Sequence, residues 1–221
     1  MTRTVLRTTI RKKLGESTAV FWQDAELNQW MEDAQLDIVW RAKLKRTRGT
    51  FTTTLSTARY VISAIFPNFL RIVGGGVWIY DSSASKWHQL DYKTKDEMKF
   101  LYPDWPNATS AQPIIYMIEP DEDMLELYPS PNSYCTGTNY CRVYHSTKPM
   151  SMANDNASPD LPQVLHPAVI DFTVATGFES RGYGDLANDH WSKYYDKIKS
   201  YLVEKNYSED EEIVMRNYKS V

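Results

Sequence analysis

The sequence predicts an α+β fold: a four-helix bundle from the two chain ends with an inserted antiparallel β-sandwich or barrel-like lobe. Apolar residues recur at helical spacing near both ends of the chain, and strand-like runs separated by turn signals fill the middle. Such a pattern favours a helical core interrupted by a β insertion. The predicted boundaries are 1–48 and 160–206 for the bundle, 49–147 for the β domain, 148–159 for a connector and 207–221 for a C-terminal tail.

The first helix is predicted from about Thr4 to Leu14, followed by Gly15, which suits the left-handed position that ends a helix. Apolar side chains at every fourth position give this helix one stripe for the core: Leu6, Ile10 and Leu14. Positive charges at the same spacing give it a second, basic stripe: Arg3, Arg7 and Arg11.

The second helix lies in a segment, Phe21 to Arg41, that carries three tryptophans: Trp22, Trp30 and Trp40. One face follows the helical period and is expected to pack in the bundle: Leu27, Trp30, Met31, Ala34 and Ile38. Cations are expected in its last turns, before Gly49 ends it: Arg41, Lys43, Lys45 and Arg46. A second apolar side needs another partner, so a neighbouring subunit is expected to contact Leu36, Val39, Trp40 and Arg41.

The middle of the chain, from Thr50 to about His145, consists of β-branched and aromatic runs. Eight runs predict strands: TFTTTL, RYVIS, FLRIV, VWIY, KWHQL, IIYMIE, MLELY and YCRVYH. One short helix is predicted from about Thr94 to Tyr102. Gly74–Gly76 lacks the GKS/T signature of a phosphate loop and is predicted to form a bend or bulge between strands.

Two further helices are predicted after the connector. Pro167 suits the first turn of one helix, and Asp185 suits the N-cap of the other. The last helix repeats apolar and aromatic residues on one side: Ala187, Trp191, Tyr194, Tyr195, Ile198 and Leu202. After Lys205 the sequence is first acidic and then apolar, without the period of a core helix.

No residue pattern points to catalysis, a cofactor or a metal, so the protein is predicted not to be an enzyme and to need no cofactor. The histidines belong to no HExxH motif or spaced ligand set, and structural roles are favoured for them: His88, His145, His166 and His190. Asp121–Asp123 lacks the EF-hand spacing and fits a hairpin turn better. Cys135 and Cys141 flank a predicted TGTN turn, and whether they form a bond stays open, with the reduced state favoured.

The charge distribution leaves an alternative function open. The net charge of −3 argues against a dedicated nucleic-acid binder. However, residues 1–48 contain ten Lys/Arg and six Asp/Glu, whereas the remainder contains 15 and 22. A nucleic-acid-binding module using the basic N-terminal helices is therefore the alternative, and it predicts salt-dependent DNA affinity. A third class, a carbohydrate-binding β module or a hydrolase, would need a concave pocket with convergent polar groups.

No apolar run approaches the length of a membrane span, and the N-terminus shows no secretion signal. We therefore expect no membrane partner.

Several motifs follow one another along nearly the whole chain: RTTIRKKLGE, FWQDAELNQWMEDAQLDI, RYVI with FLRIVG, LELYPSP, YCRVYH with KPM, and the segment from Asp160 to Ile198. This succession resembles the head-to-tail adaptor proteins of tailed bacteriophages, also described as connector or tail-tubular-A-like proteins. The motifs contain no catalytic residue, so the resemblance concerns architecture and assembly.

The resemblance implies a structural virion protein in the neck or tail, assembled in the host bacterial cytoplasm. It implies a ring beneath the portal protein, typically of twelve copies, that continues the DNA channel without binding DNA specifically. The tail nozzle, and often the tail fibres, would dock on this ring. The C-terminal segment of such proteins commonly reaches along the portal, which maps here to Tyr207–Val221 with four apolar anchors: Ile213, Val214, Met215 and Tyr218.

Overall fold

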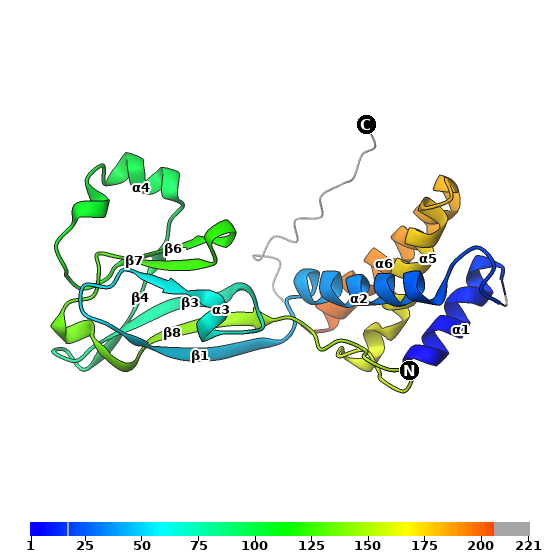
Figure 1. The fold of residues 1–221 in the computed structure, drawn as a ribbon, viewed down its shortest axis with the longest axis horizontal. Helices are drawn as coiled ribbons and strands as arrows, with labels where there is room; N and C mark the ends of the chain where they lie inside the picture. Colours follow the sequence, from blue (N-terminus) through cyan, green and yellow to red (C-terminus); the bar gives the residue numbers. More distant parts are fainter. Residues whose placement is uncertain (17, 206–221) are drawn as a thin grey trace. The chain divides into compact units, whose positions relative to one another are not determined.

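The computed structural model describes residues 1–16 and 18–205. The described residues form two compact units: one contains residues 1–44 and 149–205, without residue 17, and the other contains Lys45–Lys148. We call them the helical unit and the β unit. Helices from the two chain ends pack together, and the strands form two four-stranded sheets, so the predicted α+β class is confirmed (Figure 1).

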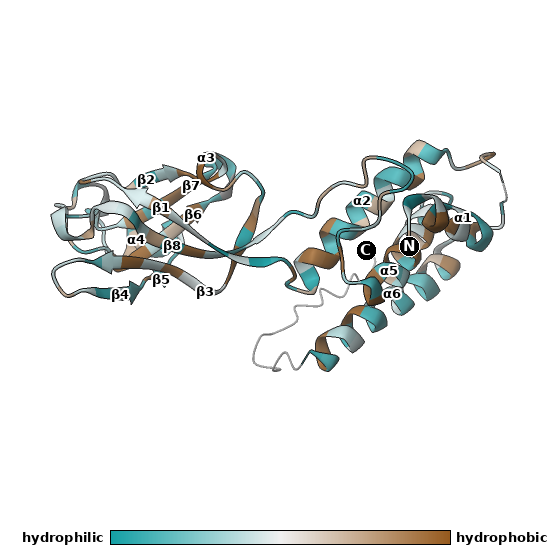
Figure 2. Ribbon diagram, turned by 90° about the horizontal axis from the view of Figure 1, so that it is seen from below, coloured by the Kyte–Doolittle hydropathy of each residue, from teal (hydrophilic) through white to brown (hydrophobic). Residues whose placement is uncertain are grey.

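The helical unit is organised around one central helix. Its four long helices are α1 (Arg3–Leu14), α2 (Asp24–Arg41), α5 (His166–Glu179) and α6 (Gly184–Glu204). A 3₁₀ turn, η4 (Gln163–Leu165), precedes α5. Helix α5 packs against each of the other three, and ten of its 14 residues are buried. Helix α6 differs from this buried helix: Figure 2 shows apolar and hydrophilic residues alternating along α6, as expected of a helix with one solvated side.

Local signals explain where the N-terminal helices begin. Thr2 accepts a hydrogen bond from the Val5 backbone N–H at the start of α1. Gly15 ends α1 in the left-handed conformation, with φ 79°. The backbone N–H of Gln23 donates to the Glu26 carboxylate (2.8 Å) at the start of α2.

Helix α2 ends at Arg41, earlier than the sequence predicts. Lys43 and Lys45 adopt the left-handed conformation, with φ 49° and 52°, and strand β1 begins at Arg46. The prediction of cations in the last helical turns is therefore confirmed for Arg41 and wrong for Lys43, Lys45 and Arg46, and the prediction that Gly49 ends the helix is also wrong. The reason is long-range, since the backbone from Arg46 onward pairs with strand β8 instead of continuing the helical hydrogen bonds.

The β unit contains two sheets. The first has the order β1-β8-β3-β4, formed by β1 (Arg46–Thr53), β8 (Gly137–Thr147), β3 (Phe69–Asp81) and β4 (Lys86–Gln89). The second has the order β2-β7-β6-β5, formed by β2 (Arg59–Val61), β7 (Met124–Tyr128), β6 (Ile115–Glu119) and β5 (Asp91–Tyr92). Paired strands are antiparallel except β5 and β6, which are parallel. The connections contain α3 (Ile62–Ile65), α4 (Lys95–Leu101), η1 (Trp105–Asn107), η2 (Pro120–Glu122) and η3 (Ser133–Cys135).

One apolar core is shared by the two sheets. The first sheet contributes Phe51, Val77, Ile79, Cys141 and Val143. The second sheet contributes Tyr60, Tyr116, Leu125 and Leu127. In β3 and β8 these buried residues alternate with partly exposed ones, so one face of the first sheet packs on the core and the other faces outward.

Each of the eight predicted runs contains strand residues, but RYVIS continues into helix α3 after Val61, TFTTTL extends past the end of β1 at Thr53, and FLRIV and VWIY belong to a single strand, β3. The predicted bulge at Gly74–Gly76 lies inside this strand, where the pairing with β8 shifts register between Ile72 and Val77. Strand β5 was not predicted, because its two residues are too few to show a period. The predicted TGTN hairpin turn is wrong, since most of it belongs to the start of β8.

The two cysteines are free thiols buried in the core of the β unit. Burial raises the pKa of the Cys135 thiol to about 11, and it also raises the pKa of Cys141. Both residues therefore behave as small apolar side chains.

A glycine is required at position 49 by close packing. A Cβ added to Gly49 would lie 2.2 Å from the Phe66 ring, which also packs against the His145 ring with centroids 4.5 Å apart. We expect Gly49→Ala to lower the free energy of unfolding of the β unit by about 1–3 kcal/mol, because the ring cannot move aside without disturbing the core.

Urea denaturation followed by circular dichroism measures this effect. Gly184→Ala is the matched control, because no atom lies within 4 Å of the added Cβ. Equal midpoints for the two variants would contradict the packing argument.

Candidate assembly interface

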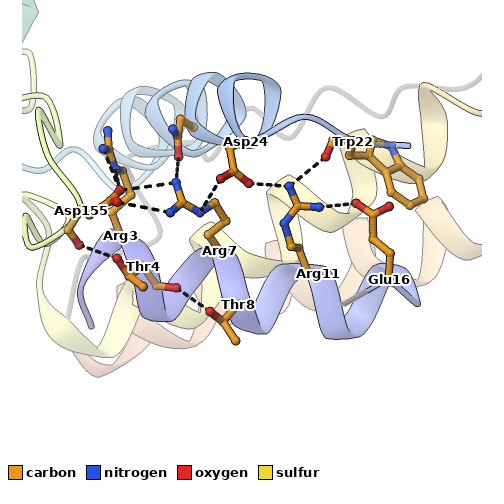
Figure 3. Close-up of polar contacts among 10 residues, drawn as sticks. Arg3, Thr4, Arg7, Thr8, Arg11, Glu16, Trp22, Asp24 and Asp155 are labelled. Carbon is orange, nitrogen blue, oxygen red and sulfur yellow. Dashed lines mark hydrogen bonds and ion pairs between the residues drawn. The ribbon is translucent and has the colours of Figure 1, made fainter. Parts of the chain in front are cut away.

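The basic stripe of α1 is engaged by carboxylates of the same unit. Figure 3 shows the three arginines in a row along α1, each pointing toward a carboxylate of another segment: Arg3, Arg7 and Arg11. Arg3 and Arg7 approach Asp155 at 2.9 and 3.4 Å. Asp24 contacts Arg7 and Arg11, and Arg11, which is 6% exposed, also contacts Glu16. The stripe therefore stabilises the fold and has its charge balanced within the chain.

The segment between β8 and η4 is fixed to α1 and α2 by its backbone. The Glu32 carboxylate accepts hydrogen bonds from the Met152 N–H (2.7 Å) and the Ser151 hydroxyl (2.9 Å). The buried Gln35 accepts one from the Asp160 N–H (2.8 Å). Polar side chains of α2 thus position a segment that contains no regular secondary structure.

A buried carboxylate joins three helices of the helical unit. The Asp171 side chain on α5 is 2% exposed and accepts hydrogen bonds from Lys13 on α1 (2.8 Å) and from Lys197 (2.5 Å) and His190 (2.9 Å) on α6. Burial alone would raise the pKa of Asp171, but these three donors outweigh it and lower the pKa below its ordinary value. The residue is therefore a charged structural centre inside the unit.

The C-terminal half of α2 presents two large apolar side chains to solvent. Leu36 is 39% exposed and Trp40 is 48% exposed, and their spacing of four residues places them on one side of the helix. Val39 is fully buried, because it lies on the side of α2 that packs into the helical unit. This corrects the expectation that Val39 faces a neighbouring subunit. We call Leu36 and Trp40 the α2 patch.

Arg41 borders the α2 patch and is held in place. Its Nε donates to Asp37 (2.6 Å), and its guanidinium lies 5.2 Å from the centre of the Tyr195 ring. The Tyr194 hydroxyl also donates to Asp37, so this carboxylate connects α2 with α6. The surroundings of the α2 patch are therefore rigidly supported.

A second exposed apolar pair precedes α2. Val20 and Phe21 are 63% and 62% exposed, and Arg181 donates a hydrogen bond to the Phe21 carbonyl (2.6 Å). The next residue, Trp22, is buried and donates to the Gly177 carbonyl (3.2 Å), whereas Trp30 is partly buried. We call Val20 and Phe21 the entry patch. No periodic pattern marks it in the sequence, and only its exposure in the structure identifies it.

The predicted portal anchors lie outside the described residues: Ile213, Val214, Met215 and Tyr218.

Within residues 1–16 and 18–205, no group of three or more His, Cys, Asp or Glu side chains is placed to hold a metal ion. A cavity of about 520 Å³ in the β unit is lined by Trp105, Tyr128, Glu126 and several serines. Glu126 is buried there and lies 3.3 Å from Arg59. No described helix is both long enough and apolar enough to cross a membrane.

The sequence matches the family described as SU10 adaptor protein over residues 1–216, which includes both units. No match was found among curated proteins.

The charge of Asp171 is expected to stabilise the helical unit. Asp171→Asn removes the anion that three donors share, and we expect it to cost about 2 kcal/mol at pH 7, the range for hydrogen bonds to charged groups. Because the folded-state pKa is lowered, the stabilisation is full above the unfolded pKa and is lost as the pH falls through the folded pKa.

Urea midpoints at pH 7 and pH 3 measure both effects. The midpoints of the unaltered protein and of Asp171→Asn should differ at pH 7, and this difference should be smaller at pH 3, because part of the stabilisation by the charge is lost on acidification. Asp189→Asn, which removes an exposed carboxylate from the same helical unit, is the control and should change the midpoint little. A difference between the Asp171→Asn and unaltered proteins that is as large at pH 3 as at pH 7 would exclude the charge as the cause.

Proposed function

Because the chain belongs to the SU10 adaptor protein family, whose members are non-enzymatic head-to-tail adaptors of bacteriophages, we propose that it forms a ring of twelve copies between the portal and the tail. The adaptor role implies a place in the neck of the virion and contacts with portal and tail components. In the proposed ring, DNA passes through the channel without specific binding, and the tail nozzle and fibres dock on the side away from the head.

The family match over residues 1–216 is the observation that carries this proposal. In the proposed ring, the helices within 1–48 and 160–206 form a four-helix bundle, and 49–147, together with Arg46–Arg48 of β1, form the tail-facing β domain. Residues 148–159 connect the two, and 207–221 reach the portal.

The two apolar patches of the helical unit support a ring contact. A closed ring needs two different complementary surfaces on each subunit, because each copy contacts its two neighbours through opposite sides. The α2 patch and the entry patch lie toward opposite ends of α2, an 18-residue helix about 27 Å long. We assign the α2 patch with Arg41 to one lateral surface and the entry patch to the other.

The contacts of the basic residues favour a channel subunit over the nucleic-acid-binding alternative. The arginines of α1 and Arg41 contact carboxylates of the same chain. Lys43, Lys45 and Arg46 also have interaction partners. Specific or tight DNA binding would need such cations to contact phosphates instead.

Electron microscopy of virions from the native source tests the ring. We expect an axial ring of this chain between the capsid vertex and the tail. The double variant Leu36→Ser and Trp40→Ser should still fold, as its circular dichroism spectrum can verify, because neither side chain belongs to the buried core, yet virions supplied with it should lack the ring.

The matched control for this variant is Val203→Ser, which changes another exposed apolar residue of the helical unit. A complete ring of the double variant would exclude the α2 patch from the lateral contact. A protein of the unaltered sequence that is absent from the virion neck would overturn the proposed function itself.

The C-terminal tail is proposed to attach the ring to the portal. Its acidic part, Ser208–Glu212, precedes four apolar residues that we assign as portal anchors: Ile213, Val214, Met215 and Tyr218. Deletion of 207–221 should leave the folded units intact and abolish co-sedimentation of the chain with portal-containing heads. Replacement of the four anchors by serine should have the same effect, and unchanged attachment of both variants would contradict this assignment.

A further inference from the structure

The outward face of the first sheet carries large aromatic rings. Ile79 on β3 and Cys141 on β8 are opposite one another and point into the core, so their neighbours along each strand point outward. The strand register places these residues side by side on that face: Arg48, Trp78, Tyr80, Trp87, Tyr140, Arg142 and Tyr144. We call this set the aromatic face.

The rings of the aromatic face support one another. Tyr80 packs against Trp87 and Tyr140, with ring centroids 5.3 and 5.0 Å apart. The Arg142 guanidinium lies 3.9 Å from the centre of the Trp87 ring. A Cβ at Gly75 would come within 2.8 Å of the Tyr144 ring, so the glycine leaves room for this side chain. The face is therefore preorganised in the free chain.

The charge of the aromatic face is of one sign. None of the outward-pointing positions of β1, β3, β4 and β8 that make up this face is Asp or Glu, although the chain has 28 acidic and 25 basic residues. Among the described residues, no carboxylate forms an ion pair with Arg48 or Arg142. The Nε atom of Arg142 is buried and has no hydrogen-bond partner there. The Arg142 guanidinium thus lies against the Trp87 ring, Arg48 is paired with Tyr144 in the strand register, and neither arginine has a balancing carboxylate within the described residues.

This composition matches that of protein interfaces. The free face of an antiparallel sheet usually carries polar residues of both charges. Interface centres are instead enriched in Tyr, Trp and Arg and depleted in Asp, Glu and Lys.

The ring geometry argues against a sugar or nucleic-acid base as the occupant. Such ligands stack on open ring faces. Here Tyr80 meets Tyr140 at 81° and Trp87 at 51°, and Arg142 covers one side of Trp87.

We propose that the aromatic face is the docking surface for a tail protein of the virion, through a segment that carries carboxylates beside apolar side chains. The carboxylates pair with Arg48 and Arg142, and the apolar groups pack on the rings. This assignment rests on the proposed adaptor function and adds the surface and the chemistry of the partner.

A photo-crosslinking residue at Gln89 tests the assignment in assembled virions. Gln89 is exposed and directly opposite Trp78, so it lies at the border of the aromatic face. After irradiation, mass spectrometry should identify a crosslinked peptide of a tail protein that contains Asp or Glu. A peptide of the portal protein or of a second copy of this chain would overturn the proposal, as would the absence of any crosslinked peptide.

Charge reversal gives an independent measurement. Virions supplied with Arg48→Glu and Arg142→Glu should retain the chain on the head, while tailed particles should fall at least tenfold. The matched control, Lys86→Glu with Lys99→Glu, makes the same charge change elsewhere on the β unit and should leave tailed particles unchanged.

The two failures are distinguishable. Tailed particles at the control level would overturn the aromatic face as a docking surface while leaving the adaptor function intact. Absence of the unaltered chain from the neck would refute the adaptor function. The melting temperature of each purified variant verifies its fold, and the crosslink at Gln89 keeps the assignment testable if charge reversal unfolds the β unit.

Discussion

The helical unit depends on keeping one buried carboxylate charged. Asp171 lies in the most enclosed helix, where an unpaired anion would be strongly destabilising. Its donors come from α1 near the start of the chain and from α6 near its end, so neutralising this charge requires both ends to be present. Apolar packing alone would allow α1, α5 and α6 to slide past one another into several similar arrangements. Two lysines and a histidine that bind one carboxylate select a single arrangement of these helices.

A second polar system orders the part of the helical unit that has no regular secondary structure. Glu32 and Gln35 on α2 accept hydrogen bonds from backbone N–H groups of residues 152 and 160, and Asp155 accepts from the arginines of α1. The segment between the β unit and α5 is therefore attached both to α1 and to α2. Charged residues that in the sequence look typical of a solvated surface thus pair with other groups of the same chain. Exposed apolar residues such as Trp40 are therefore the better indicators of a contact with another protein.

The sequence was sufficient where local signals decide the structure. The stripe of α1, the left-handed Gly15 and the strand runs all depend on neighbours a few residues away. It failed where distant segments compete, as at Arg46, whose backbone pairs with a strand about a hundred residues later. The residues proposed to form contacts with other proteins show the same division. Helical spacing indicated the exposure of Leu36 and Trp40 but could not show that Val39 points inward, and the aromatic face could be recognised only from the register of four strands.

The β unit begins and ends on paired neighbouring strands, since Arg46 at the start of β1 lies opposite Ser146 near the end of β8. The points where the chain enters and leaves the β unit are thus only one strand spacing apart, so the β unit is an insertion with a narrow base. A different lobe with the same narrow base could replace it without altering the path of the flanking chain. Under the proposed function, recombination at these two points would give a phage a new surface for the tail while preserving the helices that we assign to the ring contact.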